Sequence, residues 1–568
     1  MDTKRLILAI LLSFVILFGY QLLFVKKAPV AQPVIPSASP AAQVQSAQGG
    51  TVSPVRPDAQ PGRTETAEKP AVPNAAAAEA VSAASEIKTR VQTSLFDAVW
   101  SNKGGVLLSW KLKKHLDGKK QPLEMVPLAT ETLGVHPFSL IEEAQGALPV
   151  IDLAAIKANP LNAAFYEVSG SDLVIKDGQK GELRFRYSDG KDLEVEKIYT
   201  FVGGAYDFQV DIKVLRAGKA VEPRILWGPG IGNPTPEEIK KSYNMGGGMT
   251  SMAGKSLYRI EERKYKPENS VRNFLDWAAY DDNYFCVLFL PAGQAGTAAL
   301  VRADVNGSAS FFLTMSRPGR IFLGPKDFDR LSALGHNAKK LLRFGTFGIF
   351  AEVLYSTIKV IHRAFPNWGW SIIILTLIIK IIFFPLTYSS SKSMAKMAEL
   401  QPKIKALQHK YKKSKTDIDE RKRMNEEMMA LYKQHGVNPA GGCLPLIIQI
   451  PFFFGIFSML RSAIEFRQSP WILWIGDLSV RDPYYVTPIL MGITQFITQK
   501  MTPSTADSGQ AKMMMIMPFV MTIFFMNFQS GLVLYWLTSN VLQIGQQALI
   551  NSMMRRKKGE THGKSGKK

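Results

Sequence analysis

A single basic side chain lies in the middle of a strongly apolar segment. Lys380 falls within residues 370–386, a run dominated by Ile, Leu and Phe. A lysine at the centre of a membrane-spanning helix costs about 3 kcal/mol on insertion scales, so it must face protein or trapped water. No Asp or Glu occurs in any segment that we predict to span the membrane. We interpret this pattern as a lone positive charge in a water-containing cavity inside a membrane.

Polar side chains recur on the other predicted spans. Near the C-terminus, Trp536, Asn540, Gln543 and Gln547 share one helical face. Facing a common interior, such residues form a hydrophilic groove around the lysine. The alternative is ordinary hydrogen bonding between helices, worth about 0.6 kcal/mol per pair. The predicted groove residues are Lys380, Thr376, Gln449, Thr494, Gln495, Thr498, Trp536, Asn540 and Gln543.

Two other predicted spans, residues 440–461 and 513–527, are rich in Met and Phe. Methionine gives an adaptable apolar surface that tolerates varied ligands. The alternative for these side chains is ordinary packing against lipid. The residues that we select for an adaptable surface are Ile448, Phe452, Met514, Met517 and Met521.

Catalysis finds little support in the sequence. Residues 248–256 resemble a phosphate-binding loop, but five residues separate the two glycines where the motif needs four. The seven histidines show no metal-ligand spacing, and no Gly-x-Ser-x-Gly elbow occurs. The two cysteines, Cys286 and Cys443, fall in different predicted regions, so we expect no disulfide between them. We predict a protein that is not an enzyme and that needs no metal or cofactor.

The first 347 residues divide by composition. Residues 6–25 carry no charge and are long enough to span a bilayer, which predicts a membrane anchor over 1–27. Residues 28–86 are rich in Ala and Pro and predict a disordered tether. Within 87–347, apolar and polar residues alternate, most clearly over 183–187, 206–214, 284–290 and 310–315. Short alternating runs between Gly, Asp and Asn turns predict an all-β, antiparallel sandwich.

The remaining residues predict a membrane bundle. Residues 348–366 have the pattern of an amphipathic helix at the membrane interface. Residues 367–553 follow as a bundle, with spans near 368–388, 440–461, 484–500, 513–527 and 531–551, which makes six with the anchor. Residues 389–436 hold 12 Lys or Arg against six Asp or Glu, and 554–568 form a second basic segment, in a chain of net charge +22. Both basic segments should be cytoplasmic, which puts both termini inside and the sandwich outside.

Residues 391–436 predict a helical hairpin. Apolar residues recur every three or four positions along each half, which is the spacing of a coiled-coil seam, and Pro402 ends or bends the first helix. We interpret the hairpin as a docking arm, and the alternative is a solvated charged linker. The docking residues that we select are Met397, Leu400, Tyr411 and Met428.

Several motifs occur in order between residues 350 and 555. They include Gly369-Trp-Ser-Ile-Ile-Ile374, Lys380, Pro385-Leu-Thr387, Leu400-Gln-Pro-Lys-Ile404, Gly441-Gly-Cys-Leu-Pro445 and Gly531-Leu-Val-Leu-Tyr535. This set resembles the Oxa/Alb/YidC family of bacterial membrane protein insertases. The anchor, tether and sandwich resemble the form found in Gram-negative inner membranes, whose periplasmic sandwich has a galactose-mutarotase-like fold. Many relatives have arginine in place of Lys380, and relatives often have tyrosine in place of Trp536.

The resemblance implies insertion and folding of integral membrane proteins in the inner membrane without ATP, alone or with the Sec translocon. The Lys380 groove would receive a client's hydrophilic flank, the Met- and Phe-rich residues would form an apolar slide, and the hairpin would capture clients. The implied partners are nascent membrane proteins, the Sec translocon, the ribosome and signal-recognition-particle pathway, and the bilayer, with no small-molecule substrate. The alternative is a solute channel or secondary transporter with Lys380 as its anion site, but the sequence shows no internal repeat.

Overall fold

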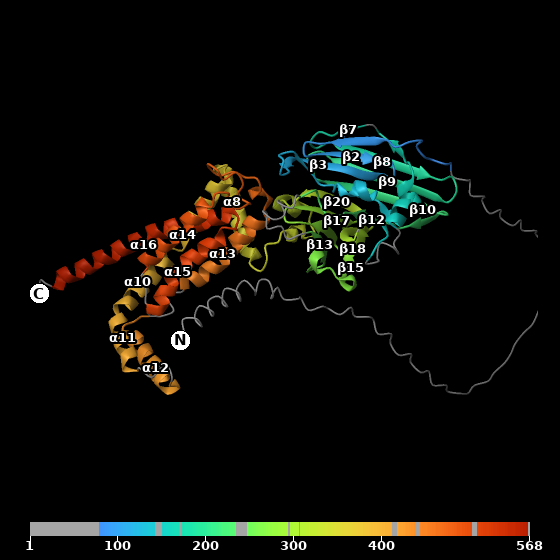
Figure 1. The fold of residues 1–568 in the computed structure, drawn as a ribbon. Coiled ribbons are helices and arrows are strands. Elements are labelled where there is room, and N and C mark those ends of the chain that lie inside the picture. Colours follow the sequence, from blue (N-terminus) through green and yellow to red (C-terminus); the bar gives the residue numbers. More distant parts are fainter. Residues whose placement is uncertain are drawn as a thin grey trace, which may run out of the picture. The chain divides into compact units, whose positions relative to one another are not determined.

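The computed structural model describes residues 79–141, 150–170, 172–234, 247–293, 296–305, 307–411, 417–437, 444–502 and 508–565. The predicted anchor, most of the tether, Cys443 and the last residues of the basic tail lie outside this part of the chain. The described chain consists mainly of strands up to residue 325 and mainly of helices after it (Figure 1).

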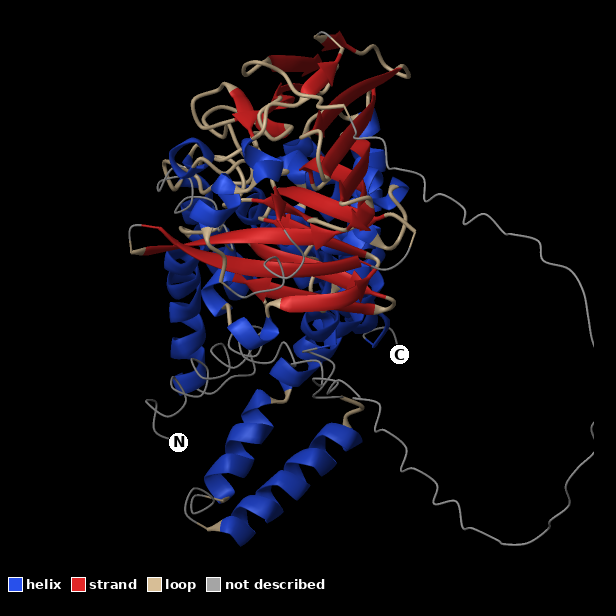
Figure 2. Ribbon diagram, turned by 90° about the vertical axis from the view of Figure 1, so that its right-hand side faces the viewer, coloured by secondary structure: helices blue, strands red, loops and turns tan. Residues whose placement is uncertain are grey.

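The strands form three sheets, which Figure 2 shows as layers. One sheet, in the order β4-β3-β2-β1-β7, contains β1 (Lys88–Gln92), β2 (Phe96–Ser101), β3 (Val106–Leu116), β4 (Pro122–Glu124) and β7 (Leu173–Val174). The largest has the order β14-β13-β16-β17-β20-β10-β9-β8-β6 with β11 paired to β10, and contains β6 (Glu167–Ser169), β8 (Lys180–Ser188), β9 (Leu193–Val202), β10 (Asp207–Arg216), β11 (Lys219–Val221), β13 (Gly248–Ala253), β14 (Ser256–Glu261), β16 (Trp277–Asp281), β17 (Phe285–Pro291) and β20 (Pro318–Pro325). The third, in the order β15-β18-β19-β12-β5, contains β5 (Leu140–Ile141), β12 (Arg224–Trp227), β15 (Val271–Leu275), β18 (Gly296–Val305) and β19 (Ser308–Ser316).

The predicted β-sandwich is confirmed, and the four alternating runs correspond to β8, β10, β17 and β19. The named strands pair antiparallel except for β1 and β7, which pair in parallel. The region is not purely β, because short helices α2 (Ala129–Leu133), α4 (Leu153–Ala158) and α5 (Pro160–Ala163) connect its strands and α7 (Phe328–Ala333) follows the last strand. These helices span one or two turns, which is too short for a 3.6-residue hydrophobic period to be recognised in the sequence.

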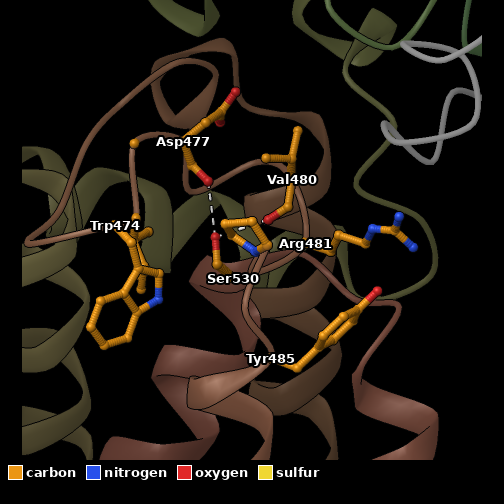
Figure 3. A pocket seen from close by; sticks show the side chains of 9 residues that line it. Trp474, Asp477, Val480, Arg481, Tyr485 and Ser530 are labelled. Atoms are coloured by element: carbon orange, nitrogen blue, oxygen red, sulfur yellow. Dashed lines mark hydrogen bonds between the residues drawn. The ribbon is translucent and has the colours of Figure 1, made fainter.

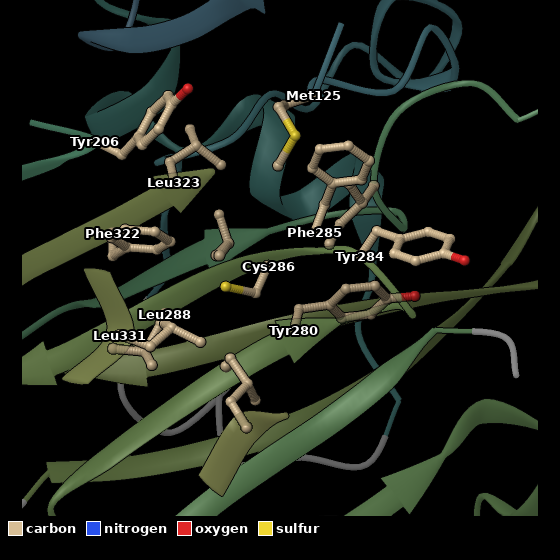
Figure 4. Packing of buried hydrophobic residues seen from close by; sticks show 14 of the residues in the cluster. Met125, Tyr206, Tyr280, Tyr284, Phe285, Cys286, Leu288, Phe322, Leu323 and Leu331 are labelled. Atoms are coloured by element: carbon tan, nitrogen blue, oxygen red, sulfur yellow. The ribbon is translucent and has the colours of Figure 1, made fainter. Parts of the chain in front are cut away.

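Alternation along the strands builds an aromatic core. On β9, Val195, Tyr199 and Phe201 all point inward and are at most 3% exposed. Trp100 packs against the Tyr199 ring with centroids 4.3 Å apart. Figure 4 shows another part of the core, where side chains of β17 and β20 surround the fully buried Cys286. Burial of such large side chains supplies most of the stability of a sandwich.

The C-terminal part of the described chain is helical (Figure 1). Asn367 accepts a hydrogen bond from the backbone amide of Trp370 and so caps the helix that carries Lys380. The helices are α8 (Gly348–Ala364), α9 (Trp368–Ile382), α10 (Phe384–Glu399), α11 (Gln401–Lys410), α12 (Ile418–Gln434), α13 (Leu444–Ser462), α14 (Val486–Met501), α15 (Ser508–Phe525) and α16 (Ser530–Ser565).

The apolar segment around Lys380 bends. Helix α9 ends at Ile382 and α10 begins at Phe384, with Pro385 in its first turn and 59° between the two helices. Proline lacks the amide hydrogen that would continue α9, so it favours a break at this point. Among the described residues, no single helix is long and apolar enough to cross a membrane, but α9 and α10 together meet that criterion. The six-span arrangement therefore stays a prediction.

Helices α11 and α12 lie side by side as a hairpin (Figures 1 and 2). Helix α11 starts at Gln401, directly before Pro402, whose fixed φ suits a first turn. Asp417 caps α12 by accepting hydrogen bonds from the amides of Asp419 and Glu420. The hairpin stands on α10 of the bent pair, so its two halves are joined to the segment that carries Lys380.

Candidate functional site

The final helix, α16, carries three of the nine predicted groove residues. It also contacts α9, α13 and α14, the helices that carry the other six. Its polar face contacts α9 and α10 on one side and α14 on the other. The sequence spacing of Trp536, Asn540, Gln543 and Gln547 explains this, because steps of four, three and four residues keep side chains on one helical face. The candidate groove is therefore built on α16 and lies against three other helices.

Lys380 is held at the junction of α9 and α16. Its Nζ donates a hydrogen bond to Gln543 Oε1 at 2.9 Å, and Gln546 Nε2 donates to the Lys380 carbonyl oxygen at 3.0 Å. Among the described residues, no carboxylate lies within ion-pair distance of this ammonium. Lys380 occupies the last turn of α9, where the negative end of the helix dipole favours a cation. The break in the apolar segment thus stabilises a charge that a continuous helix would leave uncompensated.

A second polar group connects α16 with α14. Trp536 Nε1 donates to Gln495 Oε1 at 3.2 Å. Asn540 Nδ2 lies 3.2 Å from the Met491 carbonyl oxygen and 3.4 Å from Thr494 Oγ1. Asn540 is 6% exposed, so its amide would be costly without these partners. The group fixes α14 and α16 to each other as well as making this face polar.

The threonines of the predicted groove have their hydroxyl groups turned to their own helices. Thr376 is 1% exposed and donates to the Ile372 carbonyl oxygen at 2.7 Å. Thr494 and Thr498 likewise donate to carbonyl oxygens one turn earlier, at 2.8 and 2.9 Å. Such bonds inside a helix leave the hydroxyl as an acceptor only. Thr376 therefore contributes to helix packing and does not offer a donor to the groove.

Three polar contacts of α16 involve residues outside the predicted set. Ser391 Oγ on α10 donates to Gln547 Oε1 at 3.3 Å, and the side chains of Tyr535 and Gln449 are hydrogen-bonded to each other. Gln546 also contacts Lys380, as described above. The sequence carried a weak signal for it, since Gln546 lies three residues after Gln543 and so on the neighbouring turn.

The predicted slide residues have unequal environments. Phe452 packs between the rings of Phe350 and Phe383, with centroid distances of 5.3 and 5.0 Å. Met514 on α15 is 41% exposed, and Met517 is half-buried. Ile448 and Met521 are also partly buried. Met514 is thus placed for contact with an external apolar segment, whereas Phe452 is engaged in the fold.

Two of the four side chains that we selected as docking residues, Met397 and Leu400, are buried, and the other two are partly buried. Met397, Leu400 and Ile404 are 6%, 5% and 6% exposed and form one cluster with Val437. Met428 packs against this cluster, and Tyr411 donates its hydroxyl to Glu427 Oε1 at 2.7 Å. The regularly spaced apolar side chains of the seam therefore pack into the hairpin's own core. Met429, which is 58% exposed, is a large apolar side chain that α12 presents outward.

A buried carboxyl group lies outside the predicted spans. Glu465 follows α13 and accepts a hydrogen bond from the Tyr355 hydroxyl of α8, while its other carboxyl oxygen is buried without a partner. Burial raises the pKa of Glu465 to about 7 from an ordinary 4.5, and the Tyr355 bond opposes this shift. The folded chain therefore binds more protons than the unfolded chain between these values, so stability falls as the pH rises through this window.

We expect Glu465→Gln to remove this pH dependence, because glutamine resembles the protonated acid. The thermal unfolding midpoint of the variant should exceed that of the wild type at pH 8 and approach it at pH 5. Differential scanning calorimetry of the full chain in detergent measures both values. Glu426→Gln, at an exposed position on α12, is the matched control. If the unfolding midpoints of Glu465→Gln and the wild type depend on pH in the same way, the raised pKa of Glu465 does not cause the pH dependence.

Two family models match the chain. Residues 88–357 match the YidC periplasmic domain, and residues 360–558 match the 60Kd inner membrane protein. The membrane protein insertase YidC of Geotalea daltonii is 35% identical over 564 residues, which cover 97% of this chain and 99% of that protein.

Two solved structures also align with parts of the chain. An active YidC insertase, in a crystal structure that resolves its first transmembrane domain, aligns at 20% identity with a TM-score of 0.35, over 82% of this chain and 93% of that one. A galactose mutarotase related enzyme from Lactobacillus acidophilus aligns at 9% identity with a TM-score of 0.27, over 42% of this chain and 97% of that one. From the family models and the near full-length relative, the chain belongs to the YidC family of membrane protein insertases.

Proposed function

We propose that this protein inserts nascent integral membrane proteins into the bacterial inner membrane and helps them to fold. The observation that carries the mechanism is Lys380, an ammonium whose side-chain partner is the neutral amide of Gln543. A cation that no described carboxylate neutralises attracts acidic or polar segments of a client. The insertase family is not an enzyme family, and the likeness to a mutarotase related enzyme concerns the fold alone.

The groove lowers the cost of moving a hydrophilic flank into the membrane. Polar backbone in hydrocarbon costs several kcal/mol for each unsatisfied group, and the amides on α16 offer partners along the way. The client's apolar segment then passes along α13 and α15 into lipid, where Met514, Met517 and Met521 supply an adaptable surface. An outside-positive potential adds about 2.3 kcal/mol per 100 mV for each acidic charge translocated.

Helix α8 supports a position at the membrane interface. Leu354 and Ile358 are buried, and α8 packs on α13 and α9. Its opposite side exposes Ile349, Val353 and Val360, which are 81%, 61% and 64% exposed. A helix with apolar residues on its outer side and His362 and Arg363 at its end suits the boundary between headgroups and acyl chains.

The proposed topology has six spans, with both termini, the α11–α12 hairpin and the basic tail in the cytoplasm. The net positive charge of residues 389–436 supports this orientation. The sandwich then lies in the periplasm, in line with the family model that residues 88–357 match. We further propose the Sec translocon and the ribosome as partners, with phosphate contacts from the basic tail to ribosomal RNA.

Client capture by the hairpin should depend on the exposed side chain of Met429. We expect Met429→Asp to weaken crosslinking of a nascent client to the hairpin severalfold and to leave the hairpin folded, because Met429 is 58% exposed. Leu400→Asp should instead unfold the hairpin, since it buries a charge in the seam. Limited proteolysis distinguishes these outcomes. Unchanged crosslinking in Met429→Asp would remove this residue from capture.

The function is tested by reconstitution. The full chain in liposomes should insert a small single-spanning client made by in vitro translation, and protein-free liposomes should not. Photo-crosslinks from the client's hydrophilic flank should reach positions near Lys380 and Met517. Crosslinks confined to the sandwich, or equal insertion into empty liposomes, would refute the proposal.

A further inference from the structure

A pocket lies between the segment that follows α13 and the first turn of α16. The cavity has a volume of about 380 Å³, and its walls include Trp474, Arg481 and Tyr485 (Figure 3). The Ser530 hydroxyl forms part of the floor and lies 2.9 Å from the carbonyl oxygens of Asp477 and Val480. These bonds fix the segment to the start of α16, so the pocket is a built feature of the helical part.

Arg481 gives the pocket a positive charge. Its side chain is exposed, and its guanidinium lies 5.9 Å from the centre of the Tyr485 ring. Within the described part of the chain, no carboxylate lies at ion-pair distance from this guanidinium. An arginine with its planar donors open to solvent is suited to the two oxygens of a phosphate.

The two acidic residues nearest in sequence are occupied by other donors. Asp482 is 1% exposed and accepts hydrogen bonds from Trp474 Nε1 at 3.1 Å and from Thr487 Oγ1 at 2.7 Å. The Asp477 carboxylate accepts from Ser479 Oγ at 2.7 Å and points away from Ser530 (Figure 3). Both carboxylates thus have other donors, and Arg481 is a charged side chain at the edge of the pocket whose guanidinium extends away from Ser530 (Figure 3).

Exposed apolar and aromatic side chains occur in the segments next to the pocket in sequence. Leu473 is 84% exposed, Tyr484 is 67% exposed and Ile472 is 39% exposed. On α14, which begins directly after the pocket, Ile489 and Ile493 are 46% and 51% exposed. Tyrosine and tryptophan favour the headgroup level of a bilayer, and aliphatic side chains beyond them favour the acyl chains.

We propose that this pocket binds the phosphate headgroup of an anionic glycerophospholipid in the periplasmic leaflet. Arg481 pairs with the phosphate, Trp474 and Tyr484 lie at headgroup level, and Leu473 and α14 contact the acyl chains. A lipid held there ties the starts of α14 and α16 to the membrane surface. The choice of leaflet rests on the topology proposed above.

Native mass spectrometry of the detergent-solubilised full chain, titrated with phosphatidylglycerol, tests the proposal. Arg481→Gln should weaken the tightest lipid binding about tenfold, since hydrogen bonds to charged groups are among the strong ones. Arg481→Lys should retain most of the binding. Arg186→Gln, which removes an exposed charge from β8 of the sandwich, should bind like the wild type. Leu473→Asp, at the exposed rim, should also weaken binding and does not disturb a buried contact.

Two results would overturn the proposal. In one, Arg481→Gln and Leu473→Asp bind phosphatidylglycerol as tightly as Arg186→Gln. In the other, inorganic phosphate at the lipid's concentration displaces the lipid, which identifies a site for free anions. Lipid binding is measured without a client, so its loss is distinct from failure of insertion by the wild type. Labelling of Tyr484→Cys from the cytoplasmic side would refute the choice of leaflet, whereas the lipid titration tests the site itself.

Discussion

Lys380→Ala should lower the rate of client insertion by about tenfold, whereas Lys380→Arg should keep most of it. The expected size follows from losing a charge-assisted contact of about 1.5–3 kcal/mol to the client's polar flank. Arginine preserves the positive charge at the end of α9, although its planar fork changes the contact with Gln543. The measurement is the initial rate of insertion of a small client with an acidic flank into liposomes that contain each variant.

The comparison of Lys380→Ala with Lys380→Arg needs one control for the loss of a positive charge and one for correct folding. Lys392→Ala removes an exposed lysine from α10 and should leave insertion unchanged. Gln543→Leu, which keeps the cation and removes its described side-chain partner, should insert at an intermediate rate. Each variant must show the thermal unfolding midpoint of the wild type. If Lys380→Ala inserts normally, the polar amides of α16 and the apolar slide are sufficient, and the charge is not the driving feature.

Local patterns in the sequence predicted the elements well. Alternation around Phe185 predicted β8. Residues 368–388 were predicted as one span, and the structure divides them between the bent pair α9 and α10 at Phe383. The spacing that identified the hairpin seam also selected the docking residues, and a regular apolar stripe describes what two helices bury against each other. Their role in docking stays a prediction. Met429 is exposed because it lies on the face of α12 that does not pack in the seam. The apolar stripe alone does not predict which side chains stay exposed.

Side-chain partners were harder to predict than elements. Thr376 was selected because it lies one turn before Lys380, yet its hydroxyl bonds to its own helix. The spacing of residues in the sequence predicts which face of a helix a side chain lies on, but it does not predict the rotamer of that side chain. Lys197 points into the sandwich from β9 at 0% exposure, held by the carbonyl oxygens of Gly104 and Phe138 at 2.6 and 3.2 Å. Contacts between residues so far apart in sequence follow from the register of the sheets, which one sequence does not reveal.

The largest effect on stability is expected for Asp281→Ala in the sandwich. Asp281 Oδ2 lies 3.0 Å from Lys326 Nζ and 3.2 Å from Arg343, and Thr250 donates to Oδ1 at 2.6 Å. Burial opposes ionisation of Asp281, but Lys326 and Arg343 more than offset this and hold its pKa below the usual range. Its contribution to stability is therefore present above the unfolded pKa and is lost as the pH falls through the folded pKa.

Removing the carboxylate leaves the Lys326 ammonium, at 0% side-chain exposure, without its acidic partner. Breaking such a buried pair costs about 3–5 kcal/mol. For a domain of this size the loss lowers the unfolding midpoint of the sandwich by about 10 °C. Calorimetry of the full chain in detergent measures this shift.

The interpretation requires that the cost arise from the stranded charge and not from the loss of packing. The double variant Asp281→Leu with Lys326→Met should therefore recover most of the midpoint, because it replaces both charges by apolar side chains of similar size. Asp211→Ala removes an acid whose ion pair with Lys213 is 58% and 63% exposed, and it should shift the midpoint little. A double variant as unstable as Asp281→Ala would show that the hydrogen bonds of Asp281 to Thr250 and Arg343, rather than the burial of Lys326, determine the loss.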